Sequence, residues 1–181
     1  IGYYALKANT SGQQNTAVGS SAMVANTTGS ENVAVGYFAL DANTTGASNV
    51  AIGWEAMTAN TTASSNTAVG RKAMHDNTTG ANLVAVGHTA MHNNSTGGGN
   101  IAIGAEALFT NTTGSQNTVV GYSSNYSSTG DNNTTIGYNS HTSAANSNNQ
   151  ITLGNANNDN LRCADTSISA LSDSRDKTNI V

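Results

Sequence analysis

The chain has 181 residues, of which only 9% are charged, and its formal net charge is -4. Nucleic acid is excluded as an expected partner, because binding phosphates needs clustered lysine and arginine side chains. No apolar run approaches the ~18 residues of a membrane span, so we expect no membrane insertion. A single cysteine, Cys163, rules out an intrachain disulfide framework. The fold must therefore be held together by the stacking of its own elements.

A 17-residue repeat begins at the N-terminus and organises the chain as far as residue 121. Its clearest copy is Asn-Val-Ala-Val-Gly at residues 32–36, and its closing glycines are Gly2, Gly19, Gly36, Gly53, Gly70, Gly87, Gly104 and Gly121. A fixed period over so many copies is typical of a solenoid or a fibre array. A composition rich in Asn, Ser, Thr and Gly can also signal disorder, but here apolar residues return to the same place in every copy.

One repeat predicts a strand, a bend, a short helical turn and a second bend. Residues 37–42 favour helix by composition but are too few for a stable helix, so we expect one or two helical turns. Asn43 ends that turn, because Asn tolerates the left-handed conformation, and residues 44–46 turn the chain. Residues 50–52, Val-Ala-Ile, form the strand, and Gly53 bends out of it. Stacked at ~4.8 Å, roughly nine coils predict a rod of about 45 Å with ladders of asparagine side chains along it.

Alternation along each strand divides its side chains between two faces. We assign Val33 and Val35 to the core of the coil, together with the Leu or Met of the helical turn, and Ala34 to the opposite face. Small residues on that face indicate close packing, either against a bulky neighbouring coil or against other copies of the chain around a threefold axis. The threefold reading is the simplest and predicts a trimer interface made by Ala17, Ala34, Ala51, Ala68, Ala85 and Ala102. The predicted fold is therefore an all-β parallel β-solenoid, or β-roll, in a homotrimeric fibre.

The repeat loosens after Gly121. The copy that ends at Gly137 is 16 residues long, and the composition becomes richer in charge after residue 160. We therefore divide the chain into regular repeats (1–121), degenerate repeats (122–160) and a junction to a further C-terminal domain (161–181). Because the chain starts inside a repeat and ends in that junction, we expect it to be part of a longer protein.

The repeats resemble two families of fibrous protein. Asn-Thr-Ala-Val-Gly and Asn-Val-Ala-Ile-Gly resemble the head repeats of trimeric autotransporter adhesins of the YadA type, and the 17-residue version with its Ala-Leu and Asn-Thr-Thr-Gly elements is more similar to repeats of phage tail fibres. Residues 150–155, 161–163 and 172–180 resemble the junction between a tail fibre and an endosialidase-type intramolecular chaperone. That family trimerises the fibre and then cuts itself off with a Ser-Lys dyad, which implies Ser172 and Lys177 here. The sequence departs from the family at Asp176, where an apolar residue is common.

These resemblances imply an extracellular protein of the virion, which forms the shaft or receptor-binding part of a tail fibre. Its partners would be its own copies, in a homotrimer, and a glycan or protein receptor on the host cell surface. Two alternatives remain open: the head of a bacterial adhesin, and a solenoid that binds glycans or ice, the latter indicated by arrays of threonine. We expect no enzyme that acts on an external substrate and no cofactor, because the repeats hold no nucleophile-base-acid set, phosphate loop or paired carboxylates.

Two further sets of residues are candidate sites. Tyr37, Trp54 and Tyr122 share the position after the closing glycine, and they form either a glycan-binding strip, since aromatic faces stack on sugars, or a half-buried flank of the coil. His75 and His92 share another position in consecutive coils and should stack. Imidazole is a common metal ligand, but the sequence offers these two no evident carboxylate or cysteine partner. We therefore predict a solvated face and no metal.

Overall fold

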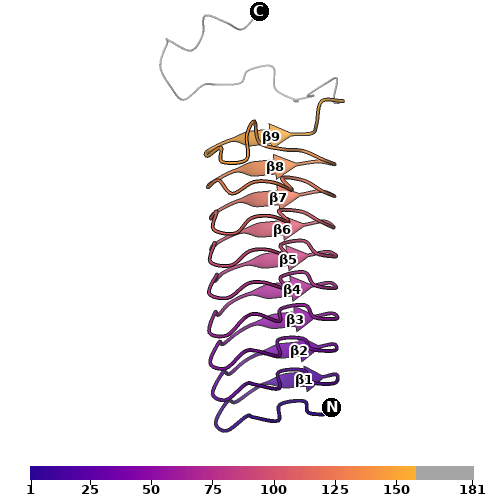
Figure 1. Cartoon of the computed structure of the whole chain (residues 1–181), viewed down its shortest axis with the longest axis vertical. Helices are drawn as coiled ribbons and strands as arrows, with labels where there is room; N and C mark the ends of the chain where they lie inside the picture. The colour runs from indigo at the N-terminus through magenta and orange to yellow at the C-terminus, as the bar shows by residue number, and fades with distance from the viewer. Residues whose placement is uncertain (158–181) are drawn as a thin grey trace, which may run out of the picture.

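A computed structural model describes residues 1–157, which form a rod of stacked coils (Figure 1). One sheet of nine parallel strands runs along the rod, and the order of the strands in the sheet is their order in the sequence. The strands are β1 (Thr16–Val18), β2 (Val33–Val35), β3 (Val50–Ile52), β4 (Thr67–Val69), β5 (Val84–Val86), β6 (Ile101–Ile103), β7 (Thr118–Val120), β8 (Thr134–Ile136) and β9 (Ile151–Leu153). The predicted parallel β-solenoid with a 17-residue period is confirmed.

Equivalent residues of successive repeats stand directly above one another. Ala34 pairs with Ala17 on one side and with Ala51 on the other. The shortened repeat keeps this alignment, because Val119 pairs with Thr135, 16 residues later. Side chains of the same kind therefore form columns along the rod, and every column repeats the contacts of one coil.

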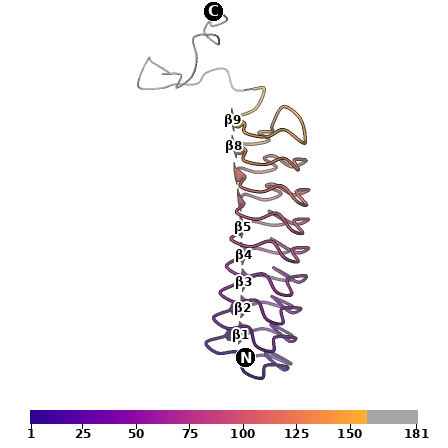
Figure 2. The same cartoon turned by 90° about the vertical axis from the view of Figure 1, so that its left-hand side faces the viewer.

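The assignment of the two strand faces from the sequence is wrong. Figure 2 shows the strands along one side of the rod and the turns on the other. The central alanines point into the coil: Ala17 is 7% exposed, and the other five of the predicted interface (Ala34, Ala51, Ala68, Ala85 and Ala102) are 0% exposed within a single chain. They share one buried cluster with the Leu or Met that stands four positions after each closing glycine: Met23, Leu40, Met57, Met74, Met91 and Leu108. These alanines cannot form an interface between chains.

The narrow interior of the coil explains this arrangement. A fully buried Leu or Met shares the interior with the strand, and protein interiors are close-packed, so the facing position is alanine in β1 to β6. The fully buried Val119 takes this position in β7, where the following coil carries Asn125 in place of Leu or Met. The larger Val33 and Val35 therefore lie on the outer face of the sheet, where both are half-buried.

No helical turn forms at residues 37–42, in contrast to the expectation. Phe38 and Leu40 have φ angles of 51° and 55°, so the backbone alternates between left-handed and ordinary conformations. Its backbone bonds to the preceding coil: the N–H of Phe38 donates to the carbonyl of Ser20 at 3.1 Å, and the carbonyl of Ala39 accepts from the N–H of Met23 at 3.0 Å. A helix would use these donors within the segment and would leave the adjoining coil unpaired. Bonding between coils therefore overrides the local preference for helix.

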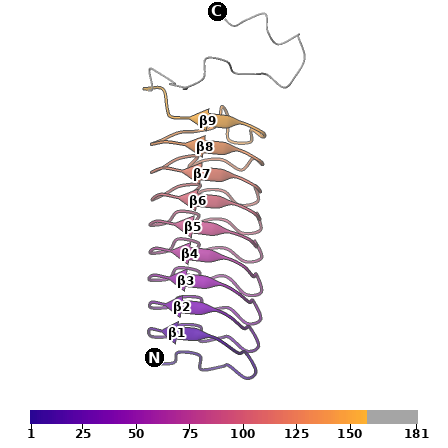
Figure 3. The same cartoon turned by 180° about the vertical axis from the view of Figure 1, so that it is seen from behind.

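Figure 3 shows, from the rear, that the bends after successive strands lie one above another, and a column of glycines occupies these bends. Gly36 has a φ of 140°, and a Cβ atom placed on it would lie 2.3 Å from the carbonyl oxygen of Gly53 in the next coil. Backbones approach so closely here that no side chain fits. The bend therefore needs glycine for space as well as for its positive φ.

Two buried ladders of asparagine lie at the turns, as expected. In the first, Asn43 Nδ2 donates to Asn26 Oδ1 at 2.8 Å and to the carbonyl of Gly46 at 3.0 Å, and Asn43 Oδ1 accepts from Asn60 Nδ2 at 3.0 Å. Its members are Asn9, Asn26, Asn43, Asn60, Asn77, Asn94 and Asn111. In the second, the backbone N–H of Asn32 donates to Asn15 Oδ1 at 2.9 Å. The ladders link consecutive coils through the interior of the rod.

Candidate functional site

The three aromatic residues predicted as a glycan strip are all exposed, but they do not form one continuous strip. Tyr37 meets Phe38 edge-on at 4.3 Å between ring centroids. Trp54 lies under the guanidinium of Arg71, 4.6 Å from the ring centroid. Tyr122 lies four coils further along, ~19 Å away at the usual strand spacing. The column therefore has aromatic residues at two separate places along the rod: Tyr37 and Trp54 on adjacent coils, and Tyr122 further on. Glycan binding by these residues stays a prediction.

At the second position two rings stack on adjacent coils. Tyr122 and Tyr138 lie 5.8 Å apart with an interplanar angle of 10°, and both are more than half exposed. This pair offers a larger flat aromatic surface than Tyr37 or Trp54. Tyr138 shares the position after the closing glycine, so the repeat itself was the signal that could have added it to the predicted site.

A different column of rings lies five positions after the closing glycines. His75, His92, Phe109 and Tyr126 occupy the same position in four consecutive coils, with centroids 5.0, 5.2 and 4.9 Å apart. The expected stacking of His75 on His92 is confirmed, with an interplanar angle of 6°.

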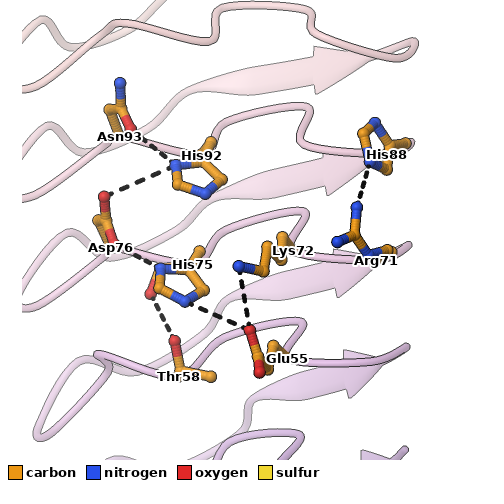
Figure 4. Close-up of polar contacts among 9 residues, drawn as sticks. All are labelled: Glu55, Thr58, Arg71, Lys72, His75, Asp76, His88, His92 and Asn93. Atoms are coloured by element: carbon orange, nitrogen blue, oxygen red, sulfur yellow. Dashed lines mark hydrogen bonds and ion pairs between the residues drawn. The ribbon is translucent and has the colours of Figure 1, made fainter.

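A carboxylate not predicted as a partner of these two histidines contacts both of them (Figure 4). Asp76 Oδ1 lies 2.5 Å from His75 Nδ1, and Asp76 Oδ2 lies 3.6 Å from His92 Nδ1. The signal was present in the repeat, because the position of Asp76 is alanine in each of the four preceding coils: Ala8, Ala25, Ala42 and Ala59. Asp76 therefore gives the histidine pair an acidic partner.

Further charged groups extend this cluster to the neighbouring coil. Glu55 Oε2 lies 3.7 Å from His75 Nε2 and 3.2 Å from Lys72 Nζ. Beside them, Arg71 Nη1 lies 2.9 Å from His88 Nε2. Three of the chain's four histidines and several of its few charges thus gather on adjoining coils of a rod that is otherwise poor in charge.

Asp41 occupies the same column as His75, two coils before it, and is partly buried. Burial raises the pKa of its carboxyl from 3.8 to about 6; backbone N–H groups of Asp41 and Ala42 lower the pKa in part, and the charge of Glu55 adds to the rise. Its Oδ1 is buried without a hydrogen-bond partner. The folded chain therefore holds this proton more tightly than the unfolded chain does.

Asp41→Asn is expected to stabilise the fold at neutral pH and to have no effect in acid. Above about pH 6 the folded state carries a poorly solvated charge, whereas below the unfolded pKa both states are protonated and the cost vanishes. We expect a gain of about 1 kcal/mol at pH 7.5, since partial exposure screens much of the 1.36 kcal/mol per pKa unit. Thermal unfolding at about pH 3.5 and 7.5 measures the difference. Glu31→Gln, on an exposed carboxyl, is the control; an equal gain for Asp41→Asn at both pH values would contradict the effect.

The outer face of the sheet carries apolar side chains along the whole described rod. Each strand contributes two outward side chains, and one of the two columns is wholly aliphatic: Val18, Val35, Ile52, Val69, Val86, Ile103, Val120, Ile136 and Leu153. Its members include strongly exposed residues such as Ile103 at 41% and Ile136 at 44%. The other column mixes Thr with Val and Ile. We call these two columns the outer sheet face.

Comparisons with protein-family models, with curated proteins and with solved structures found no match for this chain. The fold of residues 1–157 defines the class of the protein as a parallel β-solenoid. No helix within that range is long and apolar enough to cross a membrane. Ser172 and Lys177, the dyad implied by the resemblance, lie outside the described residues.

Proposed function

We propose that this chain forms the shaft of a homotrimeric attachment fibre, as in phage tails, and that its outer sheet face packs against other copies of the chain. The observation that carries the proposal is the continuous aliphatic column on that face, which runs from β1 to β9. Within one chain the coil already has its core in the alanines and the Leu or Met residues. The outer aliphatic side chains are therefore not needed for the core of the coil. Threonine would serve as well at these positions if the face were exposed to water.

The size and regularity of the outer sheet face support self-association. Extended apolar patches on soluble proteins mark interaction surfaces, and this one follows the whole rod, ~38 Å over eight strand spacings. Copies of one chain repeat the same column at the same spacing, so parallel rods match one another along their entire length. Three rods with this face turned inward around an axis would bury it, in a closed symmetric assembly.

The remaining surface suits an exposed shaft with a receptor-binding role. The stacked Tyr122 and Tyr138 rings stand in a separate column from the outer sheet face, and both are more than half exposed, so they suit a platform for a host glycan. Similarity of the repeats to phage tail fibres, and of the C-terminal segment to a chaperone junction, supports an extracellular location on the virion.

Val35→Asp together with Ile52→Asp is expected to convert the trimer to monomers. Each substitution places a carboxylate within the apolar contact, and burying an unpaired charge there costs several kcal/mol. Light scattering coupled to size-exclusion chromatography measures the mass, with the wild-type chain expected at three times the monomer mass.

The control carries the same charge on the opposite side of the coil. Ala25→Asp together with Ala42→Asp copies the residue that Asp76 already places at that position, and this variant is expected to stay trimeric. A wild-type chain that is monomeric at micromolar concentration would overturn the proposed assembly. A dimeric mass would retain the interface but reject the threefold arrangement.

A further inference from the structure

We propose that His75, Asp76 and His92 form a binding site for one divalent transition-metal ion of the zinc type. One ligand atom from each of the three side chains lies within 4.8 Å of the others. All three are only partly buried, so an ion can reach them from solvent. The site belongs to one chain and does not depend on the proposed trimer.

The donor atoms are those that zinc and its neighbours in the periodic table prefer. Two imidazole nitrogens and one carboxylate oxygen match the three protein ligands of many zinc sites, at metal-ligand distances of roughly 2.0–2.2 Å. Such bonds place neighbouring donors about 3.3 Å apart around a tetrahedral ion. The distances from Asp76 to His75 Nδ1 and to His92 Nδ1, 2.5 and 3.6 Å, lie on either side of this value. Small side-chain rotations therefore suffice, and water or Asn93 Oδ1, 2.6 Å from His92 Nδ1, supplies a fourth donor.

Contacts around His75 have the arrangement that supports a metal ligand. A coordinating histidine usually donates its second ring N–H to a carboxylate, which holds the ring and leaves the other nitrogen free for the ion. His75 turns Nδ1 toward Asp76 and Nε2 toward Glu55, and Lys72 holds Glu55 from the other side (Figure 4). When Nδ1 binds the ion, the ring proton is on Nε2, and the Glu55 carboxylate 3.7 Å away is placed to attract it.

The position of these residues in the repeat also points to a site. Other coils carry residues such as Val24 and Thr58 at the position of His75, and alanine at the position of Asp76. The rod therefore folds without the cluster, and its own stability does not explain why histidine, aspartate and histidine meet at this point.

Titration of the untagged chain with Zn²⁺ in a calorimeter tests the proposal. We expect one ion per chain, together with a rise in the unfolding midpoint in the presence of zinc. Co²⁺ in place of Zn²⁺ should give the visible absorption of a low-symmetry site with nitrogen and oxygen donors. Asp76→Ala and His75→Thr should each weaken binding roughly tenfold or more. Both variants carry residues that other coils hold at those positions, so folding is expected and circular dichroism checks it.

The control variant is His88→Ser, which copies Ser20 and removes a nearby histidine outside the three ligands. It should bind zinc as the wild type does. Absence of saturable binding in the wild type would overturn the proposal. Wild-type affinity in a folded Asp76→Ala variant, or an equal loss in His88→Ser, would also overturn it, because the contacts would then be ion pairs and any zinc would be bound elsewhere.

Discussion

Gly36→Ala is expected to lower the free energy of unfolding by about 3 kcal/mol or more. The added Cβ would lie 2.3 Å from the carbonyl oxygen of Gly53, which belongs to the backbone of the next coil and cannot move alone. The φ of 140° adds the strain of a backbone region that is almost restricted to glycine. Chemical denaturation at a fixed chain concentration measures the loss, because assembly makes stability depend on concentration.

Gly98→Ala is the matched control for this substitution. A Cβ atom on Gly98 would meet its nearest neighbour, the carbonyl oxygen of Ala81, at 3.4 Å, and Ala47 and Ala81 already stand at the equivalent position. We expect a change within about 1 kcal/mol, toward greater stability, because alanine restricts the unfolded chain. If both substitutions cost the same, contact between the bends of successive coils would not be the reason for glycine at Gly36.

Asn43→Ala is expected to cost about 2–4 kcal/mol, the second large effect. The substitution leaves the buried Asn26 Oδ1 without a hydrogen-bond partner. It also removes one bond from the carbonyl of Gly46, which keeps its bond from Asn32 Nδ2, and one from Asn60 Nδ2, which keeps its bond to the carbonyl of Ala63. Each unsatisfied buried group costs about 1–3 kcal/mol. The same denaturation experiment measures the loss, and native-state hydrogen exchange should show that it is centred on the coils around Asn43.

Asn9→Ala provides the comparison at the end of the same ladder. Asn9 is only partly buried and has no donor or acceptor below it in the ladder, so fewer groups lose their partners and water can replace them. We expect a loss of about 1 kcal/mol. Similar losses at Asn9 and Asn43 would mean that the ladder contributes little beyond the turn within each coil.

The repeat period alone was enough to predict the strands, their parallel order and the asparagine ladders. Every strand precedes a glycine at a regular interval, so Val50–Ile52 and its copies could be placed to the residue. Stacking in register then followed, because only that arrangement brings equal side chains together.

The direction of the strand side chains could not be predicted in the same way. Alternation separates Val33 and Val35 from Ala34 but does not say which face is inside. The valines were expected inside because they are the larger apolar side chains. The width of the coil decides this, and that width depends on how residues 37–42 cross the rod. Their alternating φ angles at Phe38 and Leu40 result from hydrogen bonds to other coils, which composition does not reveal.

The histidine cluster was half predicted for a related reason. The period predicts that His75 stacks on its equivalent His92, and the structure confirms it. Asp76 stands at the next position, and its carboxylate reaches both rings because of how the turn directs its side chain. Contacts between adjacent columns depend on such local geometry, whereas contacts within a column follow from counting residues.

The contacts of the rod have a short reach along the chain, and this makes its length adjustable. Backbone pairs and ladder bonds join residues 16 or 17 positions apart, so each coil depends only on its two neighbours. A whole coil gained or lost by duplication or deletion would leave the pairing of the others intact and would change the rod by ~4.8 Å. A gain or loss of a few residues inside a strand would instead misalign every column beyond it. The length of the rod can therefore change in steps of one repeat. The reach of such a fibre can be altered by duplicating a coil whose contacts already match those of its neighbours.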